Sequence, residues 1–125
     1  MHFAGILPRE SLPKALRSHA LFVFPSEYPE PWSLTLLMAL GAGCPVVATA
    51  TGGNAEILQD GVNARLFRPG DAEDLAEKAA WVLEHPEEAE VMGRRAHLSA
   101  QPYSIKTMLG ILLPLLEGAA GRSPP

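Results

Sequence analysis

The chain alternates short, continuously apolar runs with longer segments in which apolar residues recur every three or four positions. Leu21–Phe24 and Pro45–Thr49 are continuous apolar runs, which are typical of strands covered on both faces in parallel sheets. Ala64–Phe67 predicts a further short strand, and Phe3–Gly5 predicts the end of another. Because these strands alternate with helical segments, the pattern predicts an α/β protein with a parallel sheet.

Helices are expected where apolar residues follow a 3.6-residue period and a capping residue precedes them. Ser33 and Asp71 are suitable N-caps. The expected helices cover residues 10–19, 34–41, 54–58, 72–84, 86–100 and 104–117, with Asn54 as a cap of the short third one. The helix at 34–41 is apolar nearly all round, which predicts burial. Pro114 should kink or end the last helix, and residues 118–125 are expected to form a flexible tail.

Two loops, residues 25–33 and 49–54, follow buried strands and lead into helices. Ligands of open α/β sheets bind beyond the carboxyl ends of the strands, and a helix N-terminus favours phosphate. Gly52 and Gly53 would let the backbone approach a ligand closely. The carboxylate of Glu30 is an acceptor for sugar hydroxyls. These residues predict a phosphorylated, polar ligand without distinguishing nucleotides, phosphosugars and cofactors.

Each of these features also has a plainer interpretation. Paired glycines such as Gly52 and Gly53 commonly form turns, and a carboxylate in a proline-rich loop, such as Glu30, is commonly solvated. Trp32 is equally suited to anchoring the loop by packing.

The composition narrows the class of protein. A length of 125 residues, with 47% hydrophobic and 19% charged residues, predicts one globular domain. The net charge of −4 and the lack of a basic patch argue against a nucleic acid partner. The single cysteine, Cys44, excludes an intrachain disulfide, and the scattered histidines predict no metal site. No signal peptide or transmembrane segment is recognisable, so we expect a cytoplasmic protein.

A resemblance to a known family is carried by an ordered set of segments. They are Pro25-Ser26, Glu30-Pro31-Trp32-Ser33-Leu34, Ala39-Leu40, Gly43 to Thr49, Gly52-Gly53, Glu56, Asp60-Gly61 and Gly70-Asp71. This set resembles the C-terminal, donor-binding domain of retaining glycosyltransferases of the GT-B fold, group 1 or family 4-like, which include sucrose and glycogen synthases. The similarity covers nearly the whole chain. It implies a Rossmann-like parallel sheet with flanking helices, facing a second domain across a cleft.

The resemblance implies roles for particular residues. Glu30 would contact hydroxyls of the transferred sugar and is the candidate catalytic residue. The donor-binding candidates are Trp32, Ser33, Leu34, Met38, Gly52 and Gly53. The implied reaction transfers a hexosyl group, with retention, from a nucleotide-diphosphate sugar to a glycan, lipid or small-molecule acceptor. It implies no metal and no cofactor.

Three departures from the family pattern qualify this hypothesis. Met38 stands where the family has a second glutamate that grips the ribose, and a thioether is only a weak acceptor. The simpler interpretation is that Met38 is a core residue. Ser33 replaces a glycine. The first two strands, which carry a basic pair, are missing, so in the expected order 3-2-1-4-5-6 Leu21–Phe24 would form an open edge.

We therefore expect residues 1–117 to be a partial donor-binding domain of a larger or split enzyme, with the N-terminal acceptor domain on a separate chain as one option. Two rivals remain open. One is a non-catalytic remnant or a nucleotide- or phosphosugar-binding module. The other is an unrelated phosphate-binding α/β domain, receiver-like or flavin-binding, although no acidic cluster follows Phe24 or Thr49.

Overall fold

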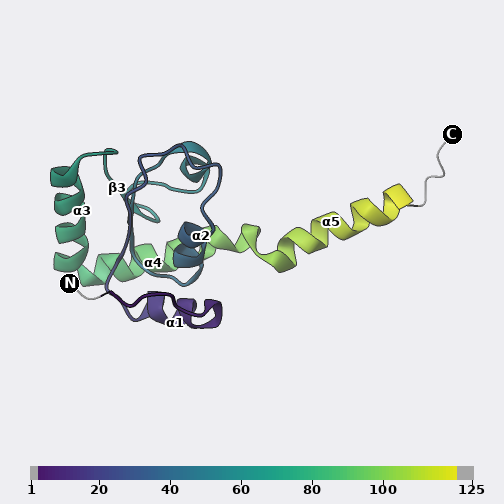
Figure 1. The fold of residues 1–125 in the computed structure, drawn as a ribbon, viewed down its shortest axis with the longest axis horizontal. Helices are drawn as coiled ribbons and strands as arrows, with labels where there is room; N and C mark the ends of the chain where they lie inside the picture. Colours follow the sequence, from purple (N-terminus) through teal and green to yellow (C-terminus); the bar gives the residue numbers. More distant parts are fainter. Residues whose placement is uncertain (1–2, 121–125) are drawn as a thin grey trace.

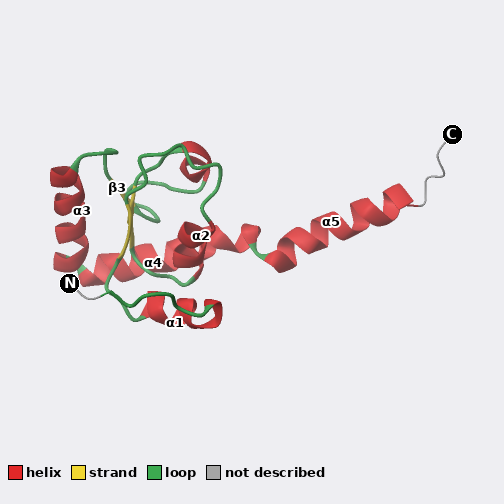
Figure 2. Ribbon diagram, viewed as in Figure 1, coloured by secondary structure: helices red, strands yellow, loops and turns green. Residues whose placement is uncertain are grey.

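The structure, a computed structural model, describes residues 3–120. Its sheet has three short parallel strands in the order β1-β2-β3, and these are β1 (Phe22–Phe24), β2 (Val46–Ala48) and β3 (Arg65–Leu66). Figure 2 shows helices on both sides of this sheet. The predicted Rossmann-like parallel sheet is therefore confirmed. The strand predicted to end at Phe3–Gly5 is wrong, because these residues form an irregular segment.

The helices follow the predicted pattern closely. They are α1 (Leu12–Arg17), α2 (Leu34–Gly41), α3 (Ala72–Glu84), α4 (Pro86–Ala100) and α5 (Ile105–Ala120), with short 3-10 turns η1 (Arg9–Ser11), η2 (Gly52–Glu56) and η3 (Gln101–Tyr103). Asp71 caps α3 as predicted, because its side chain accepts a hydrogen bond of 2.9 Å from the Asp74 N–H. Alternating strands and capped helices in the sequence were thus sufficient to place most elements.

Strand β2 lies at the centre of the fold. Val46 and Ala48 face one core cluster, which includes α2 and the C-terminal half of α4. Val47 faces the opposite side and packs with Val82 of α3 and Met92 of α4. All three β2 residues are fully buried. The side chains of a strand alternate between its faces, so β2 is covered on both sides and α4 spans the two clusters.

Strand β1 differs from its prediction. It pairs only with β2 within the described residues, with Phe22 opposite Val46 and Phe24 opposite Ala48. Val23 remains 36% exposed. The expected coverage on both faces is therefore wrong for β1, which is an edge strand, and the open edge expected at Leu21–Phe24 is present among the described residues.

Helix α2 is buried on one side only. Leu36, Ala39 and Leu40 are in the core, whereas Leu34 is 69% exposed. The burial predicted from its apolar composition is therefore wrong for the first two residues, Leu34 and Thr35, which are exposed. Its exposed face is available for contacts beyond the core.

Helix α5 projects away from the rest of the molecule (Figure 1). It contains Pro114 but does not end there, and it continues to Ala120. The predicted end at Glu117 is therefore three residues short, and the tail predicted from Gly118 is helical at its start; residues 121–125 lie outside the described part.

Helices α2 and α4 are held together through two glycines. Gly43, which follows α2, has a φ of +72°, and a Cβ atom on Gly93 of α4 would lie 2.3 Å from the Gly43 carbonyl oxygen. Backbone therefore packs directly on backbone at this point, and a side chain at position 93 would separate the two helices.

Replacing Gly93 by alanine should lower the free energy of unfolding by about 1–3 kcal/mol through this overlap. The matched control is Gly110→Ala in α5, where a Cβ meets nothing within 4 Å. Because alanine favours helix, the control should leave stability unchanged or raise it by up to about 1 kcal/mol. Urea unfolding followed by circular dichroism distinguishes the two variants. Equal effects would contradict the packing described for Gly93.

Candidate functional site at the carboxyl ends of the strands

The two loops predicted to form a site are joined by hydrogen bonds. The fully buried Thr49 donates its hydroxyl to the Ser26 carbonyl at 2.5 Å. Thr51 donates its hydroxyl to the Tyr28 carbonyl at 2.7 Å. The Gly53 N–H donates to the Glu30 carbonyl at 2.8 Å. The loop that carries Glu30 is thereby fixed on the loop that follows β2.

Because Gly52 and Gly53 have no side chains, the backbones of the two loops can pack directly against each other. A Cβ atom on Gly52 would lie 2.2 Å from the Glu30 carbonyl oxygen, and one on Gly53 would lie 1.9 Å from the Pro31 carbonyl oxygen. Gly52 also has a φ of +58°, a conformation that favours glycine. The close approach of backbone expected at these glycines is therefore an approach of one loop to the other. The space where their side chains would be is filled by protein.

Glu30 has a fixed backbone and a half-buried side chain. Its N–H donates to the Tyr28 carbonyl at 2.8 Å, and its carbonyl accepts from Gly53. The Ser26 hydroxyl lies 3.4 Å from Glu30 Oε1, in position to donate a long hydrogen bond. Its carboxylate is thus held near the end of β1 with capacity to accept further hydrogen bonds.

The start of α2 presents free backbone donors. The Ser33 hydroxyl accepts from the Leu36 N–H at 3.2 Å, which confirms Ser33 as the N-cap. The Ser33 N–H is itself taken by Asn54 Oδ1 at 3.0 Å. Among the described residues, the N–H groups of Leu34 and Thr35 have no hydrogen-bond acceptor. Such unpaired groups, at the positive end of the helix dipole, are suited to an anion.

Two residues at this helix start were misassigned or missed from the sequence. Asn54 was predicted to be the N-cap of its own short helix. The N-cap of η2 is instead Thr51, and the Asn54 side chain accepts a hydrogen bond from the Ser33 N–H. Asn54 is 1% exposed, so this link is entirely internal. Thr35 was not predicted as a site residue. It could have been, because the N–H groups in the first turn of any helix have no acceptor within the helix.

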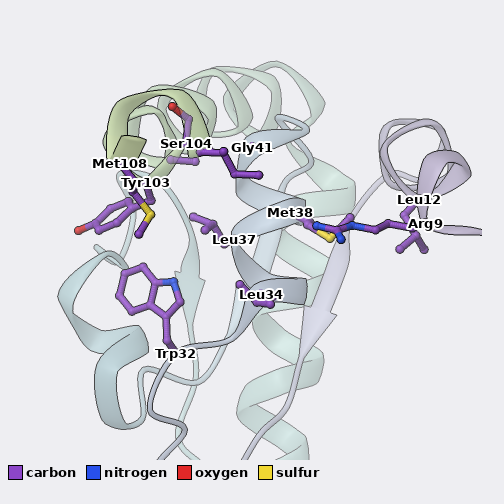
Figure 3. Close-up of a pocket in the computed structure, with 12 residues that line it drawn as sticks. Arg9, Leu12, Trp32, Leu34, Leu37, Met38, Gly41, Tyr103, Ser104 and Met108 are labelled. Carbon is purple, nitrogen blue, oxygen red and sulfur yellow. The ribbon is translucent and has the colours of Figure 1, made fainter. Parts of the chain in front are cut away.

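Met38 lies one turn after Leu34 on the exposed side of α2. It is half-buried and lines a cavity of about 880 Å³ together with Arg9 and Leu12. Figure 3 shows Arg9 and Met38 among the side chains that line this cavity. The interpretation of Met38 as a core residue is therefore wrong, because Met38 faces this cavity rather than the buried cluster.

Trp32 lines the same cavity on its opposite side. Its ring centroid lies 4.8 Å from that of Tyr103, and the side chain also packs against the core cluster that contains Leu36. The interpretation of Trp32 as a packing anchor is thus confirmed, and the indole still borders the cavity.

Carboxylates and a thiol near the sheet have defined environments. The Glu27 carboxylate lies over Gly70, in the loop before α3. The pKa of Asp74 is lowered, first because its carboxylate accepts the Arg68 backbone N–H. Burial raises the pKa of the Cys44 thiol, which is buried as predicted.

Within residues 3–120, no three His, Cys, Asp or Glu side chains form a group able to hold a metal ion. No helix in that range is long and apolar enough to cross a membrane.

Replacing Gly53 by alanine should separate the two loops, because the new methyl group would overlap the Pro31 carbonyl. We expect the free energy of unfolding to fall by about 1–3 kcal/mol. Thermal unfolding gives the measurement, with Gly118→Ala, which has open space around it, as the control. An unchanged melting temperature for Gly53→Ala would refute the close contact between the loops.

The comparisons of this chain with known proteins all point to one family. The sequence profile described as "Glycosyl transferases group 1" matches residues 1–98. Sulfoquinovosyl transferase SQD2 of Arabidopsis thaliana is 38% identical over 104 residues, which are 81% of this chain and 20% of that protein. Mannosylfructose-phosphate synthase of Agrobacterium fabrum is 33% identical over 122 residues, 97% of this chain and 26% of that protein.

The fold has the same relatives. HepE of Anabaena, solved in complex with UDP, superposes with a TM-score of 0.81 at 26% identity over 88% of this chain and 30% of that one. A second structure of HepE contains UDP-glucose. The chain thus spans at most 30% of the length of these three proteins. A profile match over residues 1–98 makes the chain a member of the glycosyl transferases group 1 family, with the Rossmann-like fold found in GT-B glycosyltransferases.

Proposed function

We propose that this chain is the donor-binding part of a glycosyltransferase that transfers a hexosyl group from a nucleotide-diphosphate sugar. The observation that supports this most directly is the pair of free N–H groups of Leu34 and Thr35 beside the fixed Glu30 loop. A diphosphate at α2 and a sugar at Glu30 would occupy adjacent positions. UDP and UDP-glucose bind to the related HepE, which favours uridine diphosphate as the carrier.

In this proposal the start of α2 stabilises the leaving diphosphate. Negative charge develops on the diphosphate as the bond to the sugar breaks, and preorganised N–H donors lower the energy of that charge. Ser33 contributes by closing the helix start rather than by donating its own N–H, which Asn54 holds. The resemblance to retaining enzymes extends the proposal to transfer with retention of the anomeric configuration.

Glu30 would accept hydrogen bonds from hydroxyls of the transferred sugar. Its backbone is fixed on both sides, so the carboxylate is positioned before the donor arrives. Gly52 and Gly53 would act on the donor indirectly, because they allow the Glu30 loop to lie where it does. Trp32 would border the donor through its indole, next to the first turn of α2.

Met38 sets a limit on ribose recognition. A thioether cannot supply the charge-assisted hydrogen bonds of a glutamate. This observation favours the second candidate function, a non-catalytic remnant or a binding module that holds the diphosphate and sugar but not the ribose. Tight binding of UDP would count against that alternative.

The proposed enzyme is larger than the described domain. The relatives are more than three times as long as the matched region, since the chain covers at most 30% of each of the three. The free edge of β1 is consistent with further strands beside it. We propose that residues 1–117 form part of a donor-binding domain whose acceptor domain is supplied elsewhere in the enzyme or by a second chain.

The test compares UDP with UDP-glucose. Each ligand at a hundred times its dissociation constant should stabilise the chain by about 2.7 kcal/mol. Glu30→Gln should weaken binding of UDP-glucose roughly tenfold or more and leave binding of UDP unchanged, because only the sugar reaches Glu30. Glu27→Gln is the matched control, since its carboxylate lies over Gly70. Titration calorimetry gives both affinities.

Loss of both affinities in Glu30→Gln with an intact fold would contradict the role given to Glu30. If neither ligand stabilises the unmodified chain, the proposal that this chain binds a donor fails.

A further inference from the structure

Two asparagines are almost completely buried, Asn54 and Asn63, and each is 1% exposed. Asn63 is fully paired. Its Oδ1 accepts from the Gln59 N–H at 2.8 Å. Its Nδ2 donates to the Ile57 carbonyl at 2.7 Å and to the Ser99 hydroxyl at 2.9 Å. Asn63 is therefore explained by the fold alone, because it ties the loop before β3 to α4.

Asn54 is paired on one side of its amide only. Its Oδ1 accepts from the Ser33 N–H at 3.0 Å. Its Nδ2 is buried and has no hydrogen-bond acceptor within residues 3–120. An unpaired buried donor lowers the stability of a fold. An aspartate at this position would offer the same acceptor without the unpaired donor, so the bond to Ser33 does not by itself explain why the residue is asparagine.

Asn54 and its neighbour Gly53 hold both ends of the segment that connects Glu30 to α2. The Gly53 N–H donates to the Glu30 carbonyl at 2.8 Å, and Asn54 accepts the Ser33 N–H. The direction of the first turn of α2 and the position of the Glu30 backbone are thus set by two consecutive residues. A change at Asn54 acts on both parts of the proposed donor site through Ser33.

The electrostatics at the start of α2 distinguish an amide from a carboxylate. The Ser33 N–H precedes the free N–H groups of Leu34 and Thr35 at the positive end of the helix. That end attracts an anion, whether the anion is a ligand or a side chain of the protein. A carboxylate at position 54 would occupy this positive potential from inside and repel a diphosphate. The neutral amide of Asn54 accepts the Ser33 N–H and adds no negative charge.

We propose that Asn54 is a positioning residue that makes the start of α2 specific for an anion supplied by the donor. Its amide fixes Ser33 and leaves the N–H groups of Leu34 and Thr35 to the diphosphate. The unpaired Nδ2 follows from this requirement, because asparagine brings a second donor together with its neutral acceptor. This inference rests on the proposed function and names a residue that determines the charge of the ligand.

Two variants separate the acceptor from the charge. Asn54→Asp keeps an acceptor for the Ser33 N–H and adds a negative charge. Asn54→Ala removes the acceptor and leaves a cavity, so it should be less stable than the unmodified chain and no more stable than Asn54→Asp. The order of affinity for UDP should be the reverse, with Asn54→Asp binding roughly tenfold or more weakly than Asn54→Ala. Urea unfolding gives the stabilities, and titration calorimetry gives the affinities.

A control variant and a second measurement isolate the charge effect. Gln59→Glu adds the same charge on an exposed side chain and should leave the affinity for UDP unchanged. Hydrogen exchange of the Ser33 amide should stay slow in Asn54→Asp and become fast in Asn54→Ala, because only the aspartate retains the acceptor. Slow exchange together with weak binding of UDP is a combination that a purely structural role for Asn54 does not produce.

An affinity for UDP that follows stability across the unmodified chain and the two variants would overturn the proposal. So would an Asn54→Asp variant that binds UDP as well as the unmodified chain, or an equal loss in Gln59→Glu. Failure of Asn54→Asp to fold would overturn it as well, because burial would then explain the asparagine. If Asn54→Ala does not fold, the comparison of Asn54→Asp with the unmodified chain and Gln59→Glu decides the question. An unmodified chain that does not bind UDP removes the donor proposal itself, whereas tight binding unaffected by Asn54→Asp removes only the role of Asn54.

Discussion

The hydrogen bonds between the two loops after β1 and β2 determine the geometry of the site. Thr49, Thr51 and Gly53 each donate to a carbonyl of the Glu30 loop. The proline-rich sequence of that loop prevents regular secondary structure, and within the loop the Glu30 N–H donates to the Tyr28 carbonyl. This local bond and the bonds from the neighbouring loop together fix its conformation, and glycine at positions 52 and 53 is the condition that allows the two backbones to meet.

The parallel sheet explains why the two loops meet at the carboxyl ends of the strands. β2 is buried on both faces, and β1 and β3 lie parallel to it. Parallel pairing aligns the carboxyl ends of the strands at one edge, so the loops that follow them are neighbours even though they are distant in the sequence. The same loops then begin α2 and η2, and Asn54 connects the two starts through Ser33. Scaffold and site are thus built from the same few segments.

Much of this arrangement could be predicted because its signals are local. The bounds of α2, α3 and α4 follow from periodicity and from the caps Ser33 and Asp71. The membership of the family followed from motif order. Contacts between distant segments were not predictable: a sequence pattern gives no indication that Asn54 holds Ser33. Nor does it show that the glycines at 52 and 53 face the neighbouring loop rather than a ligand.

The burial predicted from apolar runs was wrong where an element packs against few other elements. An apolar sequence favours burial of a strand or helix, but whether it is buried depends on which other segments pack against it. Val23 of β1, Leu34 of α2 and Leu115 of α5 are apolar and exposed. Exposed apolar residues on three elements are what a chain would have if further protein or an apolar ligand contacts them. The proposal of a larger enzyme starts from this observation.

In the proposed donor site, the first turn of α2 binds the diphosphate through the N–H groups of Leu34 and Thr35. Proton–nitrogen correlation spectra of the labelled chain, recorded during titration with UDP, test it directly. We expect the largest shifts on these two amides, while the Ser33 amide, already bound to Asn54, changes less. Largest shifts at the start of α3, or a first turn of α2 that does not respond to saturating UDP, would contradict the claim.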